Sequence, residues 1–299
     1  MDRSETYAGT SYAIDALPPS EALATMLSAH SDAIAGVAKA LADIDTAAGI
    51  IAAALSSGAR LYYAAAGSSG LMALADACEL PGTFGVDGDQ IRICMAGGVP
   101  VDGSMPGNTE DDSDQAQNAA KELRAGDVAI VVSASGTTPF ALAFAETARQ
   151  QGASVISIAN VSGSALLGLG DVAIAVPTGP EVISGSTRLG AGTAQKVALN
   201  MISTQVGILL GHVHDGLMVN LVADNIKLRQ RAAGIVKQIG GVDQDVAEQA
   251  LIKADSNTKL AVLIARGIPI DHARALLNTH NGRLRNCLKP TEREPKSTN

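Results

Sequence analysis

Five short apolar runs, each separated from the next by a segment with helical spacing, constrain the fold of this chain more than any other feature. The runs lie at residues 61–65, 91–95, 128–132, 154–158 and 172–176. Strands that alternate with helices form parallel sheets covered by helices on both faces. In most of these runs apolar and polar residues do not alternate, and such a largely apolar pattern is typical of central strands that are buried on both faces. The sequence therefore predicts an α/β fold of three layers around a five-stranded parallel sheet.

Helical segments flank the predicted sheet on both sides in the sequence. Apolar residues recur at helical spacing from about Glu21 to Leu55, so we expect residues 1–58 to form a helical arm that packs on a sheet domain at 59–232. Within 185–211 the chain predicts a long helix that is apolar on most sides. Such a helix must be buried in a core or a subunit interface, which favours a homodimer.

The C-terminal part of the chain has a different pattern. Short amphipathic helices separated by glycines predict a small helical module at residues 233–288. The last residues, 289–299, are rich in proline and charge, and we expect them to be disordered.

Composition excludes several classes of function. The net charge is −8, so nucleic acid and anionic membranes would repel most of the surface, and we expect neither as a partner. The most apolar stretch, Val197 to Val213, is interrupted by polar residues such as Asn200 and Gln205, which suits a buried helix better than a membrane span. The N-terminus lacks a secretory pattern, which predicts a cytoplasmic protein. The three cysteines show no metal-ligand spacing, so no metal site is expected.

Two loops at the ends of predicted strands are rich in serine and glycine. Gly-Ser-Ser-Gly at 67–70 follows the first run, and Ser-Ala-Ser-Gly-Thr-Thr at 133–138 follows the third. Ligands of open parallel sheets bind where strands end, and a helix that starts there aims free N–H groups at an anion. One such loop would be explained by helix capping alone, but two at one edge favour a sugar-phosphate site. Neither loop has the lysine or glycine spacing of a nucleotide site.

Two glutamates near this edge form a candidate acid–base pair. Elimination beside a carbonyl needs a base for the carbon-bound proton and an acid for the leaving oxygen. Glu79 has apolar neighbours that disfavour its charged form, whereas Glu110 is followed by two aspartates. From the residues alone, Glu110 fits an acidic helix start that faces solvent better than it fits a catalytic base, whereas Glu79 fits a structural and a catalytic role equally.

A second polar group follows the last predicted strand. Its members precede or open the long helix, and we expect them either to close over a substrate or to serve structure, with Glu181 paired to Arg188 and Lys196 solvated. The group comprises Glu181, Ser184, Ser186, Arg188 and Lys196.

The paired loop motifs resemble those of the SIS, or sugar isomerase, domain. Further stretches narrow the resemblance to one branch, because the segments at 76–85, 109–111, 179–189, 191–196 and 225–228 resemble the N-acetylmuramic acid 6-phosphate etherase family. The tail is similar to that family's small ubiquitin-associated-like helical module. The resemblance runs from about residue 20 to 288.

This resemblance implies an SIS-type fold and a set of roles. The phosphate of the substrate would lie among the hydroxyls of Ser68, Ser69, Ser133, Ser135 and Thr138. Glu79 would be the acid that protonates the lactyl ether oxygen, and Glu110 the base that acts at C2 of the opened sugar. Water would then add to the unsaturated aldehyde, which yields N-acetylglucosamine 6-phosphate and D-lactate. No metal or organic cofactor is implied.

Three positions depart from the family pattern in the same direction. Leu71 and Thr137 stand where the family commonly has arginine, and Gly190 stands where it commonly has lysine. Loss of cations beside a phosphate site weakens anion recognition. The sequence therefore leaves two alternatives open: another sugar-phosphate lyase or aldose–ketose isomerase, and a non-catalytic sugar-phosphate-sensing regulator.

Overall fold

A computed structural model describes residues 13–105 and 107–288 of the chain, which forms two compact units. The sheet unit comprises residues up to Glu79 together with Asp87–Val206. The second unit comprises Leu80–Val86 and the chain from Gly207 onward.

The sheet unit contains the five predicted strands, all parallel, in the order β2-β1-β3-β4-β5. The three central strands are buried because nearly every residue in them is apolar, as the largely apolar runs of the sequence predicted. The strands are β1 (Leu61–Ala65), β2 (Ile91–Met95), β3 (Val128–Ser133), β4 (Ser154–Ala159) and β5 (Val172–Ala175).

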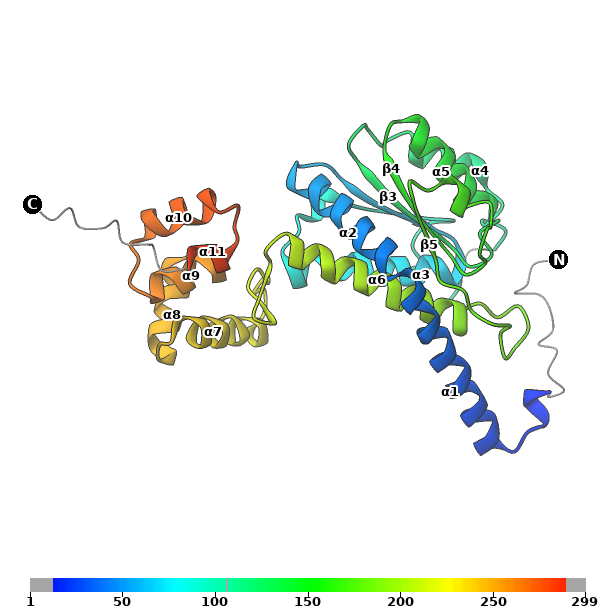
Figure 1. Ribbon diagram of the computed structural model, residues 1–299, viewed down its shortest axis with the longest axis horizontal. Helices are drawn as coiled ribbons and strands as arrows, with labels where there is room; N and C mark the ends of the chain where they lie inside the picture. Colours follow the sequence, from blue (N-terminus) through cyan, green and yellow to red (C-terminus); the bar gives the residue numbers. More distant parts are fainter. Residues whose placement is uncertain (1–12, 106, 289–299) are drawn as a thin grey trace, which may run out of the picture. The chain divides into compact units, whose positions relative to one another are not determined.

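Helices cover both faces of the sheet, which confirms the predicted three layers (Figure 1). On one face lie α4 (Ser113–Ala120) and α5 (Pro139–Gln150), where the stacked rings of Phe140 and Phe144 pack with Tyr62 of β1. The other face carries α2 (Leu41–Ser56), α3 (Gly67–Phe84) and α6 (Gly190–Leu209). Short 3₁₀ turns lie at Ile14–Ala16, Gly88–Gln90 and Leu167–Leu169.

The N-terminal arm is helical, as its apolar spacing predicted, but it is not one helix. A 3₁₀ turn at Val37–Ala40 separates α1 (Pro19–Gly36) from α2. Most of α1 is exposed, including its apolar residues Leu23 and Leu27, and Ala33 is its one buried residue.

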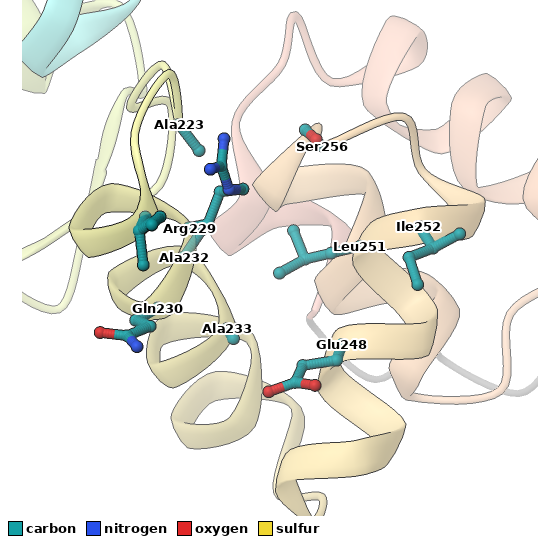
Figure 2. Close-up of a pocket in the computed structure, with 10 residues that line it drawn as sticks. Ala223, Arg229, Gln230, Ala232, Ala233, Glu248, Leu251, Ile252 and Ser256 are labelled. Carbon is teal, nitrogen blue, oxygen red and sulfur yellow. The ribbon is translucent and has the colours of Figure 1, made fainter.

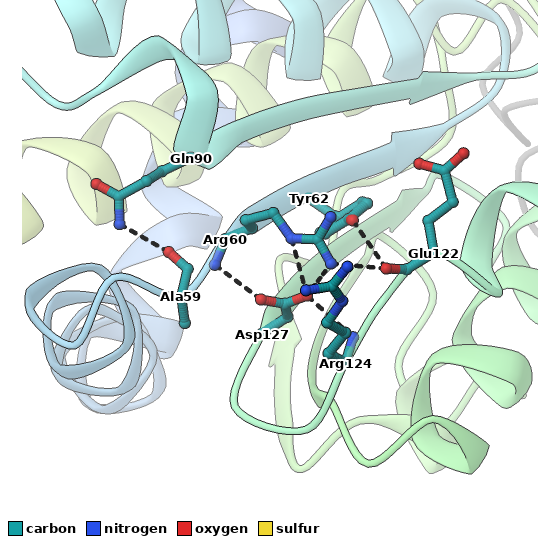
Figure 3. A network of polar contacts seen from close by, with 7 residues as sticks. All are labelled: Ala59, Arg60, Tyr62, Gln90, Glu122, Arg124 and Asp127. Carbon is teal, nitrogen blue, oxygen red and sulfur yellow. Dashed lines mark hydrogen bonds and ion pairs between the residues drawn. The ribbon is translucent and has the colours of Figure 1, made fainter.

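An ion pair closes the edge of the sheet at which the strands begin (Figure 3). The guanidinium of Arg60 donates to the Asp127 carboxylate at 2.7 and 3.2 Å, and the Arg60 backbone amide donates to the same carboxylate at 2.8 Å. The Arg124 amide adds a further bond of 3.0 Å. Burial acts to raise the pKa of Asp127, but the hydrogen bonds from Arg60 and Arg124 outweigh it and the net shift is downward.

The second unit combines a small antiparallel hairpin with five helices. The hairpin, β6 (Val213–His214) and β7 (Leu217–Met218), had no signal in the sequence because two-residue strands carry no periodicity. The helices are α7 (Ile226–Gly240), α8 (Gln244–Lys253), α9 (Thr258–Ala265), α10 (Ile270–Thr279) and α11 (Leu284–Cys287).

The core of the second unit explains why it begins before the predicted module boundary at residue 233. Val219 and Leu221 are buried in the same cluster as Val236 and Val262, so chain upstream of that boundary belongs to this core. The boundary itself falls inside α7. The predicted disordered tail, 289–299, lies outside the described residues. None of the helices in the described part of the chain is long and apolar enough to cross a membrane.

Candidate active site

The two serine-rich loops lie side by side because their strands are neighbours. β1 pairs with β2 on one side and with β3 on the other, so the chain leaves β1 and β3 in opposite directions along the sheet. This is the topological switch point at which open α/β sheets bind ligands. The structure thus brings both loops to one edge of the sheet.

The first loop joins β1 directly to α3. Gly67 opens the helix at a φ of +54°, a conformation that favours glycine. Ser68 is half-buried and Ser69 is 7% exposed, and neither hydroxyl bonds to any other described residue. Both hydroxyls therefore stand at the first turn of α3, where helix amides and the helix dipole favour an anion.

The second loop orders its hydroxyls through one another. Ser133 Oγ lies 2.8 Å from Thr138 Oγ1 and accepts the amide of Gly136 at 3.0 Å. Ser135 Oγ accepts the amide of Thr137 at 3.1 Å and its hydroxyl at 3.0 Å. These bonds fix the directions of the oxygens before any ligand arrives, so little rotamer freedom remains to be lost on binding.

Glu110 lies between the two loops. Its carboxylate sits against Gly67, so close that a Cβ at that position would collide with the Oε1 atom. Its backbone carbonyl accepts the amide of Phe140, in the first turn of α5, at 3.0 Å. The Glu110 side chain is exposed, which leaves a carboxylate beside both loops and open to a ligand.

Glu79 does not meet Glu110 within one chain, although the sequence predicted that both could face one pocket. Glu79 lies on α3, twelve residues beyond Gly67. Because an α-helix rises 1.5 Å per residue, the Glu79 backbone is about 18 Å from the loop that holds Glu110. Its side chain is exposed, so its own chain does not supply the apolar surroundings that the sequence predicted.

Glu181 binds the N-terminus of α6. Its two carboxylate oxygens accept the amides of Gly190 and Ala191, each at 2.8 Å, and the residue is 6% exposed. No ion pair among the described residues joins Glu181 to Arg188, so that structural alternative is not realised here. Glu181 also lines a cavity of about 410 Å³, which lies beside the second loop at Ala134.

The rest of that polar group is distributed along the same segment. Ser184, Arg188 and Lys196 are exposed, and Ser186 is half-buried. The amide of Ser186 bonds to the carbonyl of Ile183 at 3.0 Å, which folds the segment into turns ahead of α6. The structure places the group around the start of α6.

Sequence reasoning missed a buried aspartate that fixes α3. Asp76 is 3% exposed and accepts bonds from Tyr63 at 2.9 Å, Asn200 at 2.7 Å and Ser203 at 2.8 Å. Burial, and then the charge of Asp76, raise the pKa of Tyr63 well above its usual value, so the phenol stays a donor. The one available signal was an acidic residue in an otherwise apolar stretch of helix.

The positions where basic residues were expected are occupied differently. Leu71 is half-buried one turn into α3, and Thr137 is exposed but bonded to Ser135. Gly190 is buried, and a side chain there would lie 3.2 Å from the Glu181 carboxylate and 3.6 Å from Ala33. Backbone amides and hydroxyls are therefore the groups that this site offers to an anion.

The family model and the curated relatives that match this chain point to the same family. The SIS domain family model matches residues 27–160. The chain is 38% identical to the N-acetylmuramic acid 6-phosphate etherase of Aeromonas hydrophila over 287 residues, which cover 95% of this chain and 96% of the relative. Its identity to the etherase of Symbiobacterium thermophilum is 43% over 228 residues, or 76% of each chain. The etherase of Mycolicibacterium smegmatis is 38% identical over 281 residues, which cover 92% of this chain and 93% of the relative.

Solved structures support the fold alone. A protein of E. coli CFT073, solved in complex with a ligand, matches with a TM-score of 0.50 at 15% identity, covering 67% of this chain and 97% of that one. A protein from Bacteroides fragilis NCTC 9343 matches with a TM-score of 0.51 at 18% identity, covering 63% and 90%.

Proposed function

The chain belongs to the N-acetylmuramic acid 6-phosphate etherase family, and from this premise we propose that it cleaves the D-lactyl ether of N-acetylmuramic acid 6-phosphate. The products are N-acetylglucosamine 6-phosphate and D-lactate, which makes the protein a carbon–oxygen lyase. The observation that carries the proposal is the Glu110 carboxylate, which lies against Gly67 and between the two hydroxyl-rich loops.

The two loops hold the phosphate of the substrate. Ser68 and Ser69 offer hydroxyls that have no partner among the described residues, and Ser133, Ser135 and Thr138 offer oriented ones. The first turn of α3 adds backbone amides, which bind a phosphate without a cation. The amides and hydroxyls can therefore bind the phosphate although positions 71 and 137 carry leucine and threonine in place of basic residues.

Glu110 serves as the base. In the opened sugar the aldehyde acidifies the proton on C2, and Glu110 removes it. The C3–O bond to the lactyl group then breaks, an acid protonates the leaving oxygen, and the sugar is left as an unsaturated aldehyde. Water adds to C3 of this intermediate, and the proton balance is restored at C2. The exposure of Glu110 leaves its carboxylate accessible to the sugar.

Glu79 serves as the acid, supplied by a second copy of the chain. About 18 Å of helix separates it from Gly67 in one chain, which is too far for both glutamates to act on one sugar. A homodimer that brings the α3 helix of one copy to the loops of the other removes this separation. The exposed leucines of α1 give such a dimer apolar surface to bury.

The proposed substrate also sets the compartment. A sugar phosphate carries charge that a lipid bilayer does not pass, so its pool lies inside the cell and the enzyme works in the cytoplasm. The cytoplasmic location is proposed from the charge of the substrate and from no feature of the protein surface.

Release of D-lactate from N-acetylmuramic acid 6-phosphate tests the function. We expect Glu110→Gln and Glu79→Gln each to lower kcat by about 10³-fold, the range for lost general acid–base catalysis. No lactate from the unmodified protein would overturn the proposal. If hexose phosphates still raised its Tm, the protein would be a sensor.

Subunit mixing tests the shared site. In a mixed dimer of the Glu79→Gln and Glu110→Gln chains, one of the two sites keeps both glutamates, so random exchange restores about a quarter of the activity. If both glutamates act within one chain, mixing restores nothing. The two variants carry different affinity tags, so that purification on both tags isolates the mixed dimers, which should show about half of the unmodified activity because one of their two sites is intact.

A further inference from the structure

A polar cavity in the second unit has no role in the proposed reaction. It has a volume of about 530 Å³ and lies where the hairpin of β6 and β7, the C-terminal ends of α7 and α9, and α11 meet. We call it the arginine cavity. Most of its lining is polar or charged, and the residues are His214, Asp215, Gln238, Arg266 and Arg285, together with the apolar Leu217, Ile239 and Leu288.

A groove beside the first half of α7 has a different character (Figure 2). Its volume is about 260 Å³, and alanine, leucine and isoleucine provide most of its lining, among them Ala232 and Leu251. The arginine cavity instead has two arginines and a single acidic residue, in a chain whose net charge is −8. Positive charge that gathers in one hollow of an acidic protein attracts an anion.

Arg266 is the cation of this cavity that has no partner. It directly follows the last residue of α9, and its guanidinium forms no hydrogen bond or ion pair with any described residue. The side-chain amide of Gln238, near the end of α7, is likewise without a partner in the described part of the chain. A free guanidinium keeps its five N–H donors for a ligand.

Arg285, on α11, has a partner that a ligand can replace. Its Nη2 donates to Asp215 Oδ1 at 2.6 Å, and both side chains are 63% exposed. An exposed ion pair contributes little to stability, so breaking it costs little. The other N–H groups of this guanidinium have no partner among the described residues, and they can form a second bond to the same anion.

The hairpin places Asp215 at the cavity. Asp215 and Gly216 form its two-residue turn, with φ values of +47° and +75°. The neighbouring His214 is 6% exposed, and its Nε2 lies 3.4 Å from Asp215 Oδ2. Burial lowers the pKa of His214, so the imidazole is neutral at pH 7. The positive charge of the cavity therefore comes from the two arginines.

The end of α9 does not present bare carbonyl groups to an anion in this cavity. The carbonyl of Leu263 accepts the amide of Ile268 at 3.1 Å, and that of Ile264 accepts the amide of Gly267 at 2.9 Å. Such bonds satisfy the last carbonyls of a helix within the chain itself. A cation at this end, as Arg266 is, is also favoured by the helix dipole.

We propose that the arginine cavity binds a phosphate group, free or carried by a small metabolite, between the guanidiniums of Arg266 and Arg285. The ligand has to compete with the tethered carboxylate of Asp215. A carboxylate in solution has the same single charge and lacks the tether, whereas a phosphate has up to two charges and further acceptor oxygens. The site lies in the second unit alone and does not rest on the proposed reaction.

Protection of single arginines from phenylglyoxal tests the site without interference from the catalytic loops. The reagent modifies free guanidiniums, and mass spectrometry of peptides assigns each modified residue. In the full-length protein we expect inorganic phosphate and N-acetylglucosamine 6-phosphate to slow the modification of Arg266 and Arg285. Arg231, exposed on α7 outside the cavity, should react at its unprotected rate. The probe that protects at the lower concentration shows whether the phosphate is free or esterified.

Two substitutions should shift the binding in opposite directions. Arg266→Gln removes one guanidinium, so the dissociation constant obtained from the protection of Arg285 should rise at least about tenfold. Asp215→Asn removes the competing charge and keeps a residue that tolerates positive φ, so the dissociation constant should fall about fivefold. Arg231→Gln is the matched control and should change neither. Thermal unfolding, followed by circular dichroism, checks that every variant is folded.

Three results would each overturn the proposal. The first is that neither probe protects Arg266 at about 10 mM, which would nearly fill a site with a dissociation constant of about 1 mM. The second is that Asp215→Asn binds no more tightly than the unmodified protein. The third is that D-lactate protects as well as phosphate, which would make this a carboxylate site. Lactate release without added phosphate should be unchanged in Arg266→Gln and Asp215→Asn, so failure here is distinguishable from failure of the proposed function.

Discussion

The two edges of the central sheet satisfy their polar groups in opposite ways. Where the strands begin, the carboxylate of Asp127 accepts bonds from the Arg60 side chain, the Arg60 amide and the Arg124 amide (Figure 3). Where the strands end, Ser68 and Ser69 have hydroxyls without partners among the described residues. One edge is closed by its own side chains, and the other is left for a ligand.

This difference shows how one sheet separates stability from function. A buried charge is stable only when its partners are complete, so the first edge cannot offer groups to a substrate. A hydroxyl costs less to leave unpaired than a charged group does, and the hydroxyls of Ser68 and Ser69 stay available for a phosphate. We therefore expect substitutions at the first edge to change the free energy of unfolding and substitutions at the second to change binding.

The largest expected effect is on stability, at the closed edge. Asp127→Ala removes the carboxylate that pairs with the Arg60 guanidinium, which keeps only its bond to the Glu122 carbonyl, and leaves two backbone amides without an acceptor. We expect the free energy of unfolding to fall by about 2 to 3 kcal/mol, less than for a fully buried pair because Arg60 is partly exposed. Urea denaturation, followed through the unfolding transition of the sheet unit, measures the loss in free energy of unfolding.

The comparison of the two edges requires that this variant keep its activity. At a temperature where it stays folded, lactate release per folded molecule should match that of the unmodified protein. A loss of kcat in the folded fraction would mean that the first edge also shapes the site, and the division of labour would not hold.

A smaller effect is expected at the open edge, where two serines differ in their partners. The Ser69 hydroxyl has no partner in the part of the chain that the structure describes, so Ser69→Ala should raise the dissociation constant for N-acetylglucosamine 6-phosphate about tenfold without a cost in stability. Ser133 accepts the Gly136 amide and lies 2.8 Å from Thr138, so Ser133→Ala should weaken binding and also destabilise the fold by about 1 kcal/mol. Calorimetric titration and urea denaturation of both variants separate the two effects.

The architecture of the sheet unit follows from the sequence because its signals are local. Each central strand is apolar nearly throughout, and the serine-rich loops stand directly after β1 and β3. Once the sheet is parallel, strand pairing brings the loops after β1 and β3 together. The positions of Ser68 and Ser133 at one edge were therefore predictable.

The contacts and distances that could not be predicted from the sequence join residues that are far apart in the chain. Arg60 and Asp127 meet only because β1 pairs with β3, and no local pattern marks either as a partner of the other. The sequence left open whether Glu181 contacts a substrate or pairs with Arg188, yet its carboxylate binds the amides that open α6. The distance between Glu79 and Glu110 depends on the length of α3, which local similarity to a family does not reveal.

The smallest expected effect is a pH dependence that belongs to the closed edge alone. The folded-state pKa of Asp127 is lowered by its hydrogen bonds, against burial, so its stabilising contribution is complete above its unfolded pKa of about 3.9. The contribution is lost as the pH falls through the folded-state value. The difference in free energy of unfolding between the unmodified protein and Asp127→Asn should therefore be constant at neutral pH and shrink below about pH 4. Urea denaturation at a series of pH values measures this difference, and Ser69→Ala, which changes no titrating group, is the control. A difference that stays constant into strong acid would show that the closed edge depends on the shape of Asp127 and not on its charge.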